Sequence, residues 1–186
     1  MKKYILPSLK LTVVLIIICS ILYPLLVAGL GRFSAGKGKG TTETVNGKVV
    51  GYSEIGQKFD QDKYFWSRPS AVAFNAAGSA GSNKGPTNPD YLKDVQSKID
   101  SFLVHNSGVR KEDVPVELVT YSGSGLDPDI SPKGAYVQIA RIAKVRNIPE
   151  EKIKTIVDQH VEKSLLGPEK VNVLKLNIDL DKLGTK

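Results

Sequence analysis

The stretch Leu11–Gly31, LTVVLIIICSILYPLLVAGLG, decides the architecture of this 186-residue chain. It contains no charged residue, and a helix over it, at about 1.5 Å per residue, spans roughly 31 Å, the thickness of a hydrocarbon core. We therefore predict one transmembrane helix over residues 11–31. Its few polar side chains can hydrogen bond within the helix, whereas Pro24 should kink it and free a backbone carbonyl.

A cleaved signal peptide is the alternative interpretation, because basic residues precede the apolar stretch. The stretch is longer than a typical signal core and no A-x-A cleavage pattern follows it, so we favour a membrane anchor. Three basic residues lie on each side, which leaves the positive-inside count nearly balanced. Long domains cross membranes largely regardless of charge. We predict residues 1–10 as a short cytoplasmic tail of a cell (inner) membrane protein, with the main domain extracytoplasmic.

Charge and cysteine content exclude several classes of site. The chain has 26 basic and 19 acidic residues, but no Lys/Arg run and no aromatic–basic interleaving, so we expect no nucleic-acid partner. Basic residues beside a membrane serve more often as topology signals or partners of lipid headgroups. The single cysteine, Cys19, lies in the apolar stretch, where it can form no intramolecular disulfide and supply no metal site.

The rest of the chain is the size of one small domain. Residues 32–44 include GKGKGTTET, whose glycine and small polar residues predict a flexible tether. Residues 45–186 then form the domain. Val49–Ser53 should be a strand reached by a turn at Asn46–Gly47, and Ala76–Pro89 is a loop by composition.

Capping signals and hydrophobic periodicity predict the remaining elements of a mixed α/β domain with a few strands and three helices. Asn88 and Pro89 should start a helix that runs to about His105, and Ser131 should cap a second one. A third should begin near Pro149, with Ile153, Ile156, Val157, His160, Val161 and Leu165 on one face. Two segments predict strands: Val116–Thr120, and the alternation of Leu174, Leu176, Ile178 and Leu180 with polar residues.

Two short stretches imitate nucleotide-dependent chemistry. Gly31–Gly38 matches G-x-x-x-x-G-K but ends in Gly38, where a Ser or Thr must hold magnesium, and it lacks the strand and helix that a phosphate loop needs. Asp181–Thr185, DKLGT, resembles the phosphorylated-aspartate motif of P-type pumps. Such an aspartate needs large phosphorylation and nucleotide domains around it, and one residue follows the motif, so we expect Asp181 not to be a phosphoacceptor.

Hydrolase and metal chemistry also lack complete sets of residues. Ser122–Pro128, SGSGLDP, does not have the spacing of a G-x-S-x-G elbow. The only histidines, His105 and His160, fall on predicted helices, where a packed or surface role is commoner than that of a base. Asp127 and Asp129 flank a proline and suit a turn better than a metal. We predict no catalytic and no metal-ligating residues.

The segment Tyr64–Ala71, YFWSRPSA, has two interpretations. Trp66 and Arg68 are residue types that dominate protein interfaces, which makes them interface candidates. Alternatively, Phe65 and Trp66 fill the core. The residue pattern leaves these alternatives open.

A series of motifs resembles the C chain of the Kdp potassium-transporting ATPase, the KdpC family, over nearly the whole chain. The series is specific because its members occur in one order. They are Tyr23–Val27, Val49–Gly51, Ile55–Gln57, Tyr64–Phe65, Ser67–Ala71, Gly81–Asn83, Gly85–Pro86, Asn88–Pro89, Ser122–Pro128, Ile130–Pro132, Gln138, Arg141, Arg146, Val171–Leu174 and Leu176–Asn177. Local departures occur at Lys84, Tyr121 and Gly167–Glu169.

The resemblance implies a non-catalytic subunit of a high-affinity, ATP-driven potassium uptake pump. Its partners would be a channel-like potassium-translocating subunit, a P-type ATP-hydrolysing subunit and membrane lipid. The family is described as stabilising the assembly and as a catalytic chaperone that raises the ATP affinity of the hydrolysing subunit. The proposed nucleotide contacts correspond to Ser122, Gly123, Ser124, Gly125 and Gln138.

The chaperone role conflicts with the predicted topology, because a domain outside the membrane does not meet cytoplasmic ATP. We therefore expect no stably bound cofactor, and ATP only through the complex. A membrane-anchored envelope binding module or hydrolase remains the alternative. The helix itself carries Tyr23, Pro24 and two glycines that lipid alone does not require, so we predict that it is an assembly surface as well as an anchor.

Overall fold

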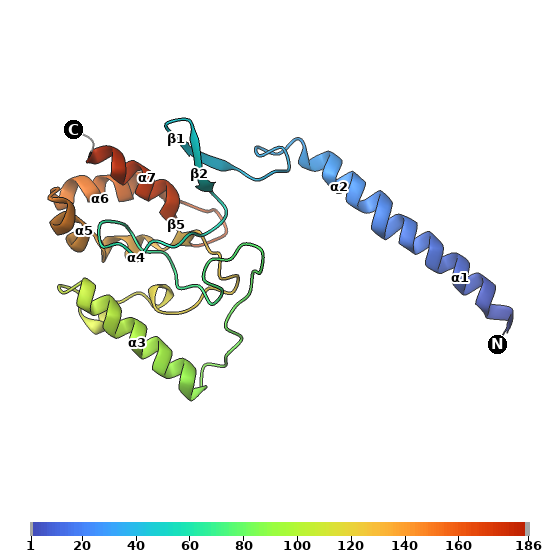
Figure 1. Ribbon diagram of the computed structural model, residues 1–186, viewed down its shortest axis with the longest axis horizontal. Coiled ribbons are helices and arrows are strands. Elements are labelled where there is room, and N and C mark those ends of the chain that lie inside the picture. The colour runs from blue at the N-terminus through green and yellow to red at the C-terminus, as the bar shows by residue number, and fades with distance from the viewer. Residues whose placement is uncertain (1, 185–186) are drawn as a thin grey trace. The chain divides into compact units, whose positions relative to one another are not determined.

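The computed structural model describes residues 2–184, and the chain divides into two units at Thr42. The first unit, residues 1–42, is dominated by one long helix (Figure 1). The second, residues 43–186, is a small folded domain that contains both helices and strands. The mixed α/β class with one N-terminal apolar helix, predicted from the sequence, is therefore confirmed.

The N-terminal helix is longer than the apolar stretch that predicted it. It consists of α1 (Lys2–Ile17), a π turn (Ile18–Leu22) and α2 (Tyr23–Gly31). Lys3–Gly31 is long and apolar enough to cross a membrane, and none of its side chains is buried within the chain. The helix begins before Leu11 because lysine is a good helix former. Lys2, Lys3 and Lys10 therefore end the apolar stretch without ending the helix.

The π turn lies directly before Pro24. The Tyr23 N–H donates to the carbonyl of Ile18, one residue further back than in an α-helix. Because Pro24 has no N–H and its ring crowds the carbonyl four residues earlier, the regular α-helical pattern cannot continue through it. The disturbance predicted at Pro24 thus takes the form of a wider turn, a feature found frequently at functional sites.

Among the described residues, the domain holds five α-helices and two small sheets. The helices are α3 (Pro89–His105), α4 (Pro132–Tyr136), α5 (Ile139–Arg146), α6 (Glu150–Gln159) and α7 (Val173–Leu183). The strands are β1 (Thr42–Val45), β2 (Lys48–Tyr52), β3 (Asp129–Ile130), β4 (Val161–Glu162) and β5 (Lys170–Asn172). Figure 1 shows α3 at one side of the domain and α6 and α7 at the other, with α4 and α5 between them.

The two sheets are built differently. β1 and β2 form a hairpin whose turn residues, Asn46 and Gly47, have φ of 52° and 75°, the left-handed conformation that Asn–Gly turns favour. This turn was predicted, but β1 begins at Thr42, within the stretch predicted as a tether. The second sheet has the order β3–β5–β4 and is antiparallel, with the fully buried Val171 paired to both neighbouring strands.

The core is apolar and is contributed by every helix of the domain and by the three-stranded sheet. Phe65 joins it from the long segment between β2 and α3, which has no regular secondary structure. The buried cluster comprises Phe65, Phe102, Leu118, Ile130, Ala135, Ile139, Ile142, Ala143, Ile153, Ile156, Val157, Val171, Val173, Leu176 and Leu180.

Local capping signals predicted two helix starts correctly. The Asn88 side chain accepts hydrogen bonds from the N–H groups of Asp90 and Tyr91, and Pro89 occupies the first turn of α3. The Ser131 hydroxyl accepts from Gly134 N–H at 2.9 Å at the start of α4. These caps satisfy helix N–H groups that have no partner within the helix.

Two predicted strands are wrong. Val116–Leu118 is a 3₁₀ turn, in which only Leu118 is buried. The predicted C-terminal strand is the helix α7, which Asn172 caps by accepting from Lys175 N–H. The leucine alternation coincides with a helical stripe, because α7 buries Val173, Leu174, Leu176, Asn177 and Leu180.

The third predicted helix forms but is shorter than its apolar face suggested. α6 buries Ile153, Ile156 and Val157 and ends at Gln159. Val161 belongs instead to β4, and Leu165 is 98% exposed in the loop that follows. A separate helix, α5, was not predicted, and α7 was predicted as a strand, so the described part of the domain has five α-helices rather than three.

Candidate functional site

Two buried side-chain amides bind the backbone of the segment Tyr64–Ala71. Asn177 of α7 accepts from the Phe65 N–H at 2.9 Å and donates to the Phe65 carbonyl at 3.0 Å. Gln138, which precedes α5, accepts from the Trp66 N–H at 2.8 Å and donates to the Trp66 carbonyl at 3.3 Å. Each amide therefore pairs with both polar groups of one residue, as a neighbouring strand would.

The aromatic side chains of this segment divide between core and groove. Phe65 is fully buried. Trp66 is half-buried and meets the ring of His105 edge-on, with 4.9 Å between the ring centroids. The guanidinium of Arg141 lies 4.7 Å from the centre of the Trp66 ring, within the range of a cation–π contact.

Arg141 is a buried cation that is held almost entirely by neutral oxygens. Its guanidinium donates to the Asn106 side chain at 3.0 Å, to Gln138 Oε1 at 2.7 Å, and to the carbonyls of Asp62 and Tyr64. The nearest carboxylate oxygen, on Asp62, is 3.9 Å away. Burial lowers the pKa of Arg141 to about 10, opposed by the charge of Asp62, so the side chain remains charged at neutral pH.

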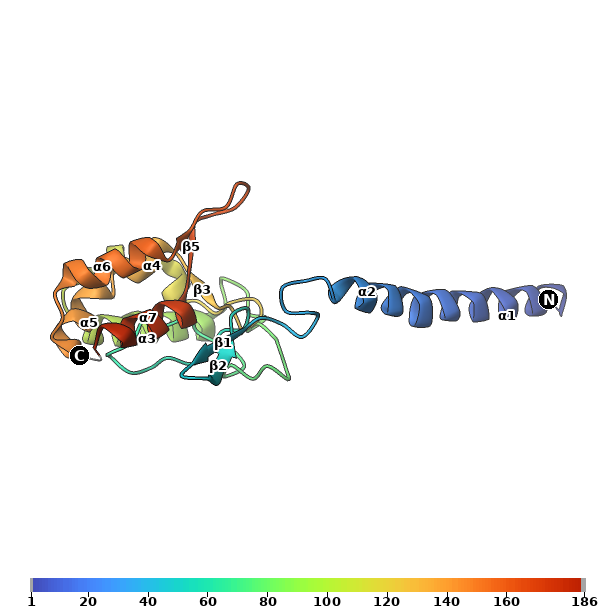
Figure 2. The same cartoon turned by 90° about the horizontal axis from the view of Figure 1, so that it is seen from above.

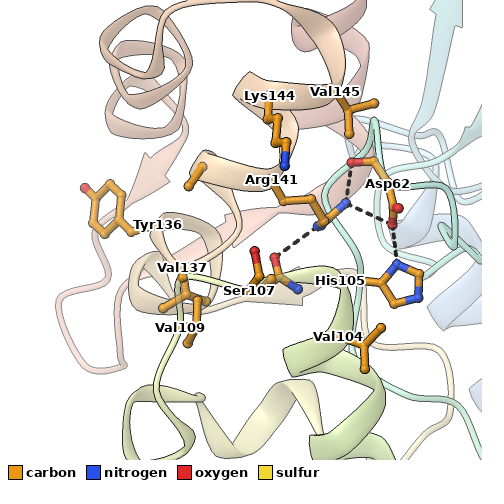
Figure 3. Close-up of a pocket in the computed structure, with 13 residues that line it drawn as sticks. Asp62, Val104, His105, Ser107, Val109, Tyr136, Val137, Arg141, Lys144 and Val145 are labelled. Carbon is orange, nitrogen blue, oxygen red and sulfur yellow. Dashed lines mark hydrogen bonds and ion pairs between the residues drawn. The ribbon is translucent and has the colours of Figure 1, made fainter.

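A groove of about 780 Å³ opens beside Arg141, between the end of α3 and the α4–α5 region (Figure 3). Apolar residues, among them Val104, Val109 and Val137, line it together with polar groups. His105 Nδ1 lies 2.8 Å from Asp62 Oδ1, and a dashed line marks this contact in Figure 3. The ring is thus paired with a carboxylate rather than with a nucleophile.

The glycine–serine loop Ser122–Gly125 packs against the end of Tyr64–Ala71 and the residues that follow it. The Ser122 N–H donates to the Pro69 carbonyl at 3.2 Å, and the Ser70 hydroxyl donates to the Gly125 carbonyl at 2.6 Å. Gly125 has a φ of +67°, and a Cβ there would lie 2.6 Å from the Val72 side chain. Glycine is needed at this position by both its conformation and its close packing.

Ser122–Gly125 and Gln138, the predicted nucleotide contacts, both bind the same segment but at different residues. Gln138 binds Trp66, and the glycine–serine loop binds Pro69 and Ser70. Gln138 is fully buried, and its amide also donates to the Gly134 carbonyl at 2.9 Å. Ser122 is buried as well, whereas Gly123 and Ser124 are exposed.

Comparison with known proteins gives the family. The sequence profile of the family described as K⁺-transporting ATPase, c chain (KdpC), matches residues 5–182. The chain belongs to the KdpC family. The match extends over the N-terminal helix and the folded domain alike, so both units are shared with the family.

Individual relatives of this KdpC-family chain cover it nearly completely. A protein of Flavobacterium johnsoniae is 55% identical over 175 residues, 94% of this chain and 96% of its own length. One of Bacteroides fragilis is 50% identical, covering 97% and 98%, and one of Caldanaerobacter subterraneus is 42% identical, covering 93% and 92%. All three are named potassium-transporting ATPase KdpC subunit.

The four interface candidates of this KdpC-family chain occupy different settings. Trp66 contacts Arg141 and His105, and Arg68 forms an ion pair with Asp127 at 2.8 Å. Both also line a second groove, of about 380 Å³, beside α3. In the N-terminal helix, Tyr23 is 65% exposed and Pro24 follows the π turn.

The acidic residues considered for chemistry are engaged in ion pairs. Asp127 pairs with Arg68, and Asp129 with Lys170 at 2.8 Å. Asp181 accepts from Arg146 at 2.7 Å and from the Tyr64 hydroxyl at 3.0 Å, while Thr185 of the DKLGT stretch lies outside the described residues. In the described part of the chain, no group of three or more His, Cys, Asp or Glu side chains could hold a metal ion.

The sequence did not identify Arg141 and Asn177 as organising residues of this region. They entered only as members of the motif series, Arg141 by itself and Asn177 within Leu176–Asn177, and Asn177 was placed on the polar side of a predicted strand. Their partners, Tyr64 and Phe65, lie 77 and 112 residues away in the sequence. A buried arginine or asparagine among apolar neighbours was the one available signal, since such groups must find hydrogen-bond partners.

Proposed function

We propose that this chain is a non-catalytic accessory subunit of a high-affinity, ATP-driven potassium uptake pump and stabilises its assembly. The observation that carries the proposal is the family match over residues 5–182, which includes both the apolar helix and the domain. The relatives of nearly equal length are named as subunits of a potassium-transporting ATPase. A chain that shares both units with them is expected to assemble as they do.

The partners in this proposal are a channel-like potassium-translocating subunit, a P-type ATP-hydrolysing subunit and membrane lipid. The exposed helix offers surface for both lipid and partner helices, because none of its side chains packs within the chain. The π turn before Pro24 and the small residue Gly29 suit close approach of another helix. Replacing residues 11–31 by a poly-leucine span should keep the domain on the membrane but reduce the yield of complex.

The proposed topology has the N-terminus in the cytoplasm and the domain outside it, in the cell (inner) membrane. An Ala77→Cys variant tests this, with Cys19→Ser as background, because Ala77 is exposed in an irregular loop. An impermeant thiol reagent should label it in intact cells. Labelling only after the cells are opened would show that the domain lies in the cytoplasm, opposite to this proposal.

The proposal extends to a role in which this chain raises the ATP affinity of the hydrolysing subunit. The Gln138 amide is buried and bonded to Trp66, Gly134 and Arg141, which supports an indirect effect through Tyr64–Ala71 rather than a direct nucleotide contact. We expect no stably bound cofactor, and ATP only through the complex. Under this proposal, Gln138→Leu raises the pump's KM for ATP only together with a loss of domain stability. A raised KM at unchanged stability would indicate direct contact.

The test of the proposed function is co-purification. The tagged full-length chain, solubilised from membranes in mild detergent, should retain two larger membrane proteins. If the chain runs alone, an envelope binding module or hydrolase becomes the better interpretation. An isolated domain with a turnover that replacement of one serine or aspartate abolishes would identify the hydrolase.

A further inference from the structure

The loop between β4 and β5 presents two leucines to solvent. Leu165 is 98% exposed and Leu166 is 97% exposed, the highest values among the large hydrophobic residues that the structure describes. We call this pair the leucine tip. Figure 2 shows the β4–β5 hairpin extending away from the rest of the domain. Single exposed apolar residues are ordinary on protein surfaces, but an adjacent and wholly exposed pair at the end of a projecting hairpin is not.

The base of the hairpin is firmly attached to the domain. Val171 of β5 is fully buried and pairs with Ile130 of β3 and Val161 of β4. The Asn172 amide donates to the Ser53 carbonyl at 2.7 Å, and Lys170 forms an ion pair with Asp129 at 2.8 Å. The tip is therefore carried on an anchored support, although its own side chains add nothing to the core.

Charges of both signs surround the leucine tip. Lys163 lies 4.0 Å from Glu169 across the loop, and Lys170 lies 3.7 Å from Glu162 across the two strands. Asp129 also neighbours Lys170, and Lys175 lies 3.8 Å from Glu162, so three acidic and three basic groups form a polar rim without net charge beside the apolar tip. This is the arrangement of a protein interface, in which a small apolar centre is enclosed by a polar rim.

We propose that the leucine tip inserts into an apolar socket, bordered by charges of both signs, on another subunit of the potassium pump. The rim favours this occupant over a lipid surface, because its lysines already have carboxylate neighbours and give no net attraction to anionic headgroups. Two leucine side chains also carry fewer carbons than one myristoyl chain, which alone binds membranes only marginally.

A second copy of this chain is a poorer occupant. Two tips that met would bury only two leucines from each chain, far below the roughly 1,200 Å² of a specific stable interface. Against another subunit, the leucine tip needs to be only one of two contacts, because the N-terminal helix supplies the other. Two linked contacts make the second one effectively intramolecular, which raises overall affinity without a larger tip. This inference rests on the proposed function.

The test is co-purification of the complex with the full-length double variant Leu165→Ser/Leu166→Ser. We expect the co-purified fraction of the larger subunits to fall at least about tenfold at low protein concentration, since two buried leucines are worth more than one factor of ten in affinity. The control variant is Leu92→Ser/Val116→Ser, which replaces side chains that are 53% and 70% exposed elsewhere on the domain. It should co-purify like the unaltered chain.

The outcomes separate this inference from the proposed function. If the unaltered chain retains no larger subunits, the proposed function fails. If the unaltered chain and the leucine variant retain them equally, only the leucine tip proposal is overturned. A photo-cross-linker attached to Leu165→Cys, in a Cys19→Ser chain, identifies the occupant. Cross-links to a larger subunit support the proposal, and cross-links only to lipid or to a second copy overturn it.

Discussion

The segment Tyr64–Ala71 and the leucine tip show opposite uses of residues that promote protein contacts. In Tyr64–Ala71, Phe65 is buried, Trp66 is covered by Arg141 and His105, and Arg68 is paired with Asp127. At the tip, both leucines lie almost wholly in solvent. Residue type alone therefore does not determine how a side chain is used: the first region engages these side chains in contacts within the domain, whereas the second leaves both leucines in solvent.

Among the changes that test this comparison, removing Arg141 should lower the stability of the domain most. Arg141→Met leaves the Asn106 and Tyr64 oxygens without this donor and removes one of the two donors to Gln138 Oε1, which should lower the free energy of unfolding by about 3–5 kcal/mol. The fluorescence of Trp66, the single tryptophan of the chain, reports unfolding of the detergent-solubilised chain, because its half-buried ring becomes fully exposed to water.

Lys144→Met is the matched control, since Lys144 is an exposed cation one turn further along α5. It should change the stability by less than about 0.5 kcal/mol. Equal stability of the two variants would mean that Tyr64–Ala71 does not depend on the buried guanidinium, and the contrast with the leucine tip would lose its structural basis.

A methyl group at Gly125 should have the next largest effect. In Gly125→Ala the residue would keep a φ of +67° while its Cβ lay 2.6 Å from Val72 Cγ2 and 2.8 Å from the Ala80 carbonyl oxygen. Left-handed strain and overpacking together should cost about 2–4 kcal/mol of unfolding free energy. Gly123→Ala is the control, because a Cβ there meets no atom within 4 Å. Similar denaturation midpoints for both variants would contradict this account of the loop.

The sequence predicted correctly those features of the fold that depend only on neighbouring residues. The caps at Asn88 and Ser131 and the Asn46–Gly47 turn act within a few residues, and each was predicted correctly. The transmembrane-length helix needed only composition. These features require no knowledge of distant contacts.

The failures have the opposite origin. α7 was predicted as a strand because its leucines alternate, but Asn177 within it must reach Phe65, 112 residues away, and only a helix buries Leu176, Asn177 and Leu180 on one face. Leu165 was assigned to the apolar face of a helix that in fact ends at Gln159. The leucine tip could therefore be recognised only once exposure was known.

A smaller loss of domain stability should appear at acid pH, when Asp179 becomes protonated. A hydrogen bond from Lys182, together with one from His160, holds the pKa of Asp179 below its usual value, against the opposing effect of burial. The pKa of Asp179 is lower in the folded state than in the unfolded state. Its hydrogen bonds with Lys182 and His160 therefore stabilise the domain above about pH 4, and this contribution is lost as the pH falls further. Asp179 is partly exposed, so the effect should not exceed about 1 kcal/mol.

Asp179→Asn provides the comparison for this titration. Urea unfolding of both chains from pH 7 to pH 2.5 should show the unaltered chain losing its advantage over the variant below about pH 4. A constant difference between the two chains over this range would exclude the contribution of Asp179.

The leucine tip should have the smallest effect on the fold. Leu165→Ser/Leu166→Ser removes no buried contact, so the free energy of unfolding should change by less than about 0.5 kcal/mol. Thermal unfolding of the variant and the unaltered chain, followed by circular dichroism, checks this. A loss of 2 kcal/mol, on the order of a buried leucine, would show that the tip packs on the domain after all.

The central claim, that this chain is a non-catalytic subunit needed by a potassium pump, is tested most directly by one measurement. Potassium-stimulated ATP hydrolysis is measured for the two larger subunits purified without this chain, with it, and for the chain alone. The account predicts hydrolysis only when the chain is present with its partners, and none by the chain alone. Full activity of the larger subunits without it, or hydrolysis by the chain alone, would contradict the account.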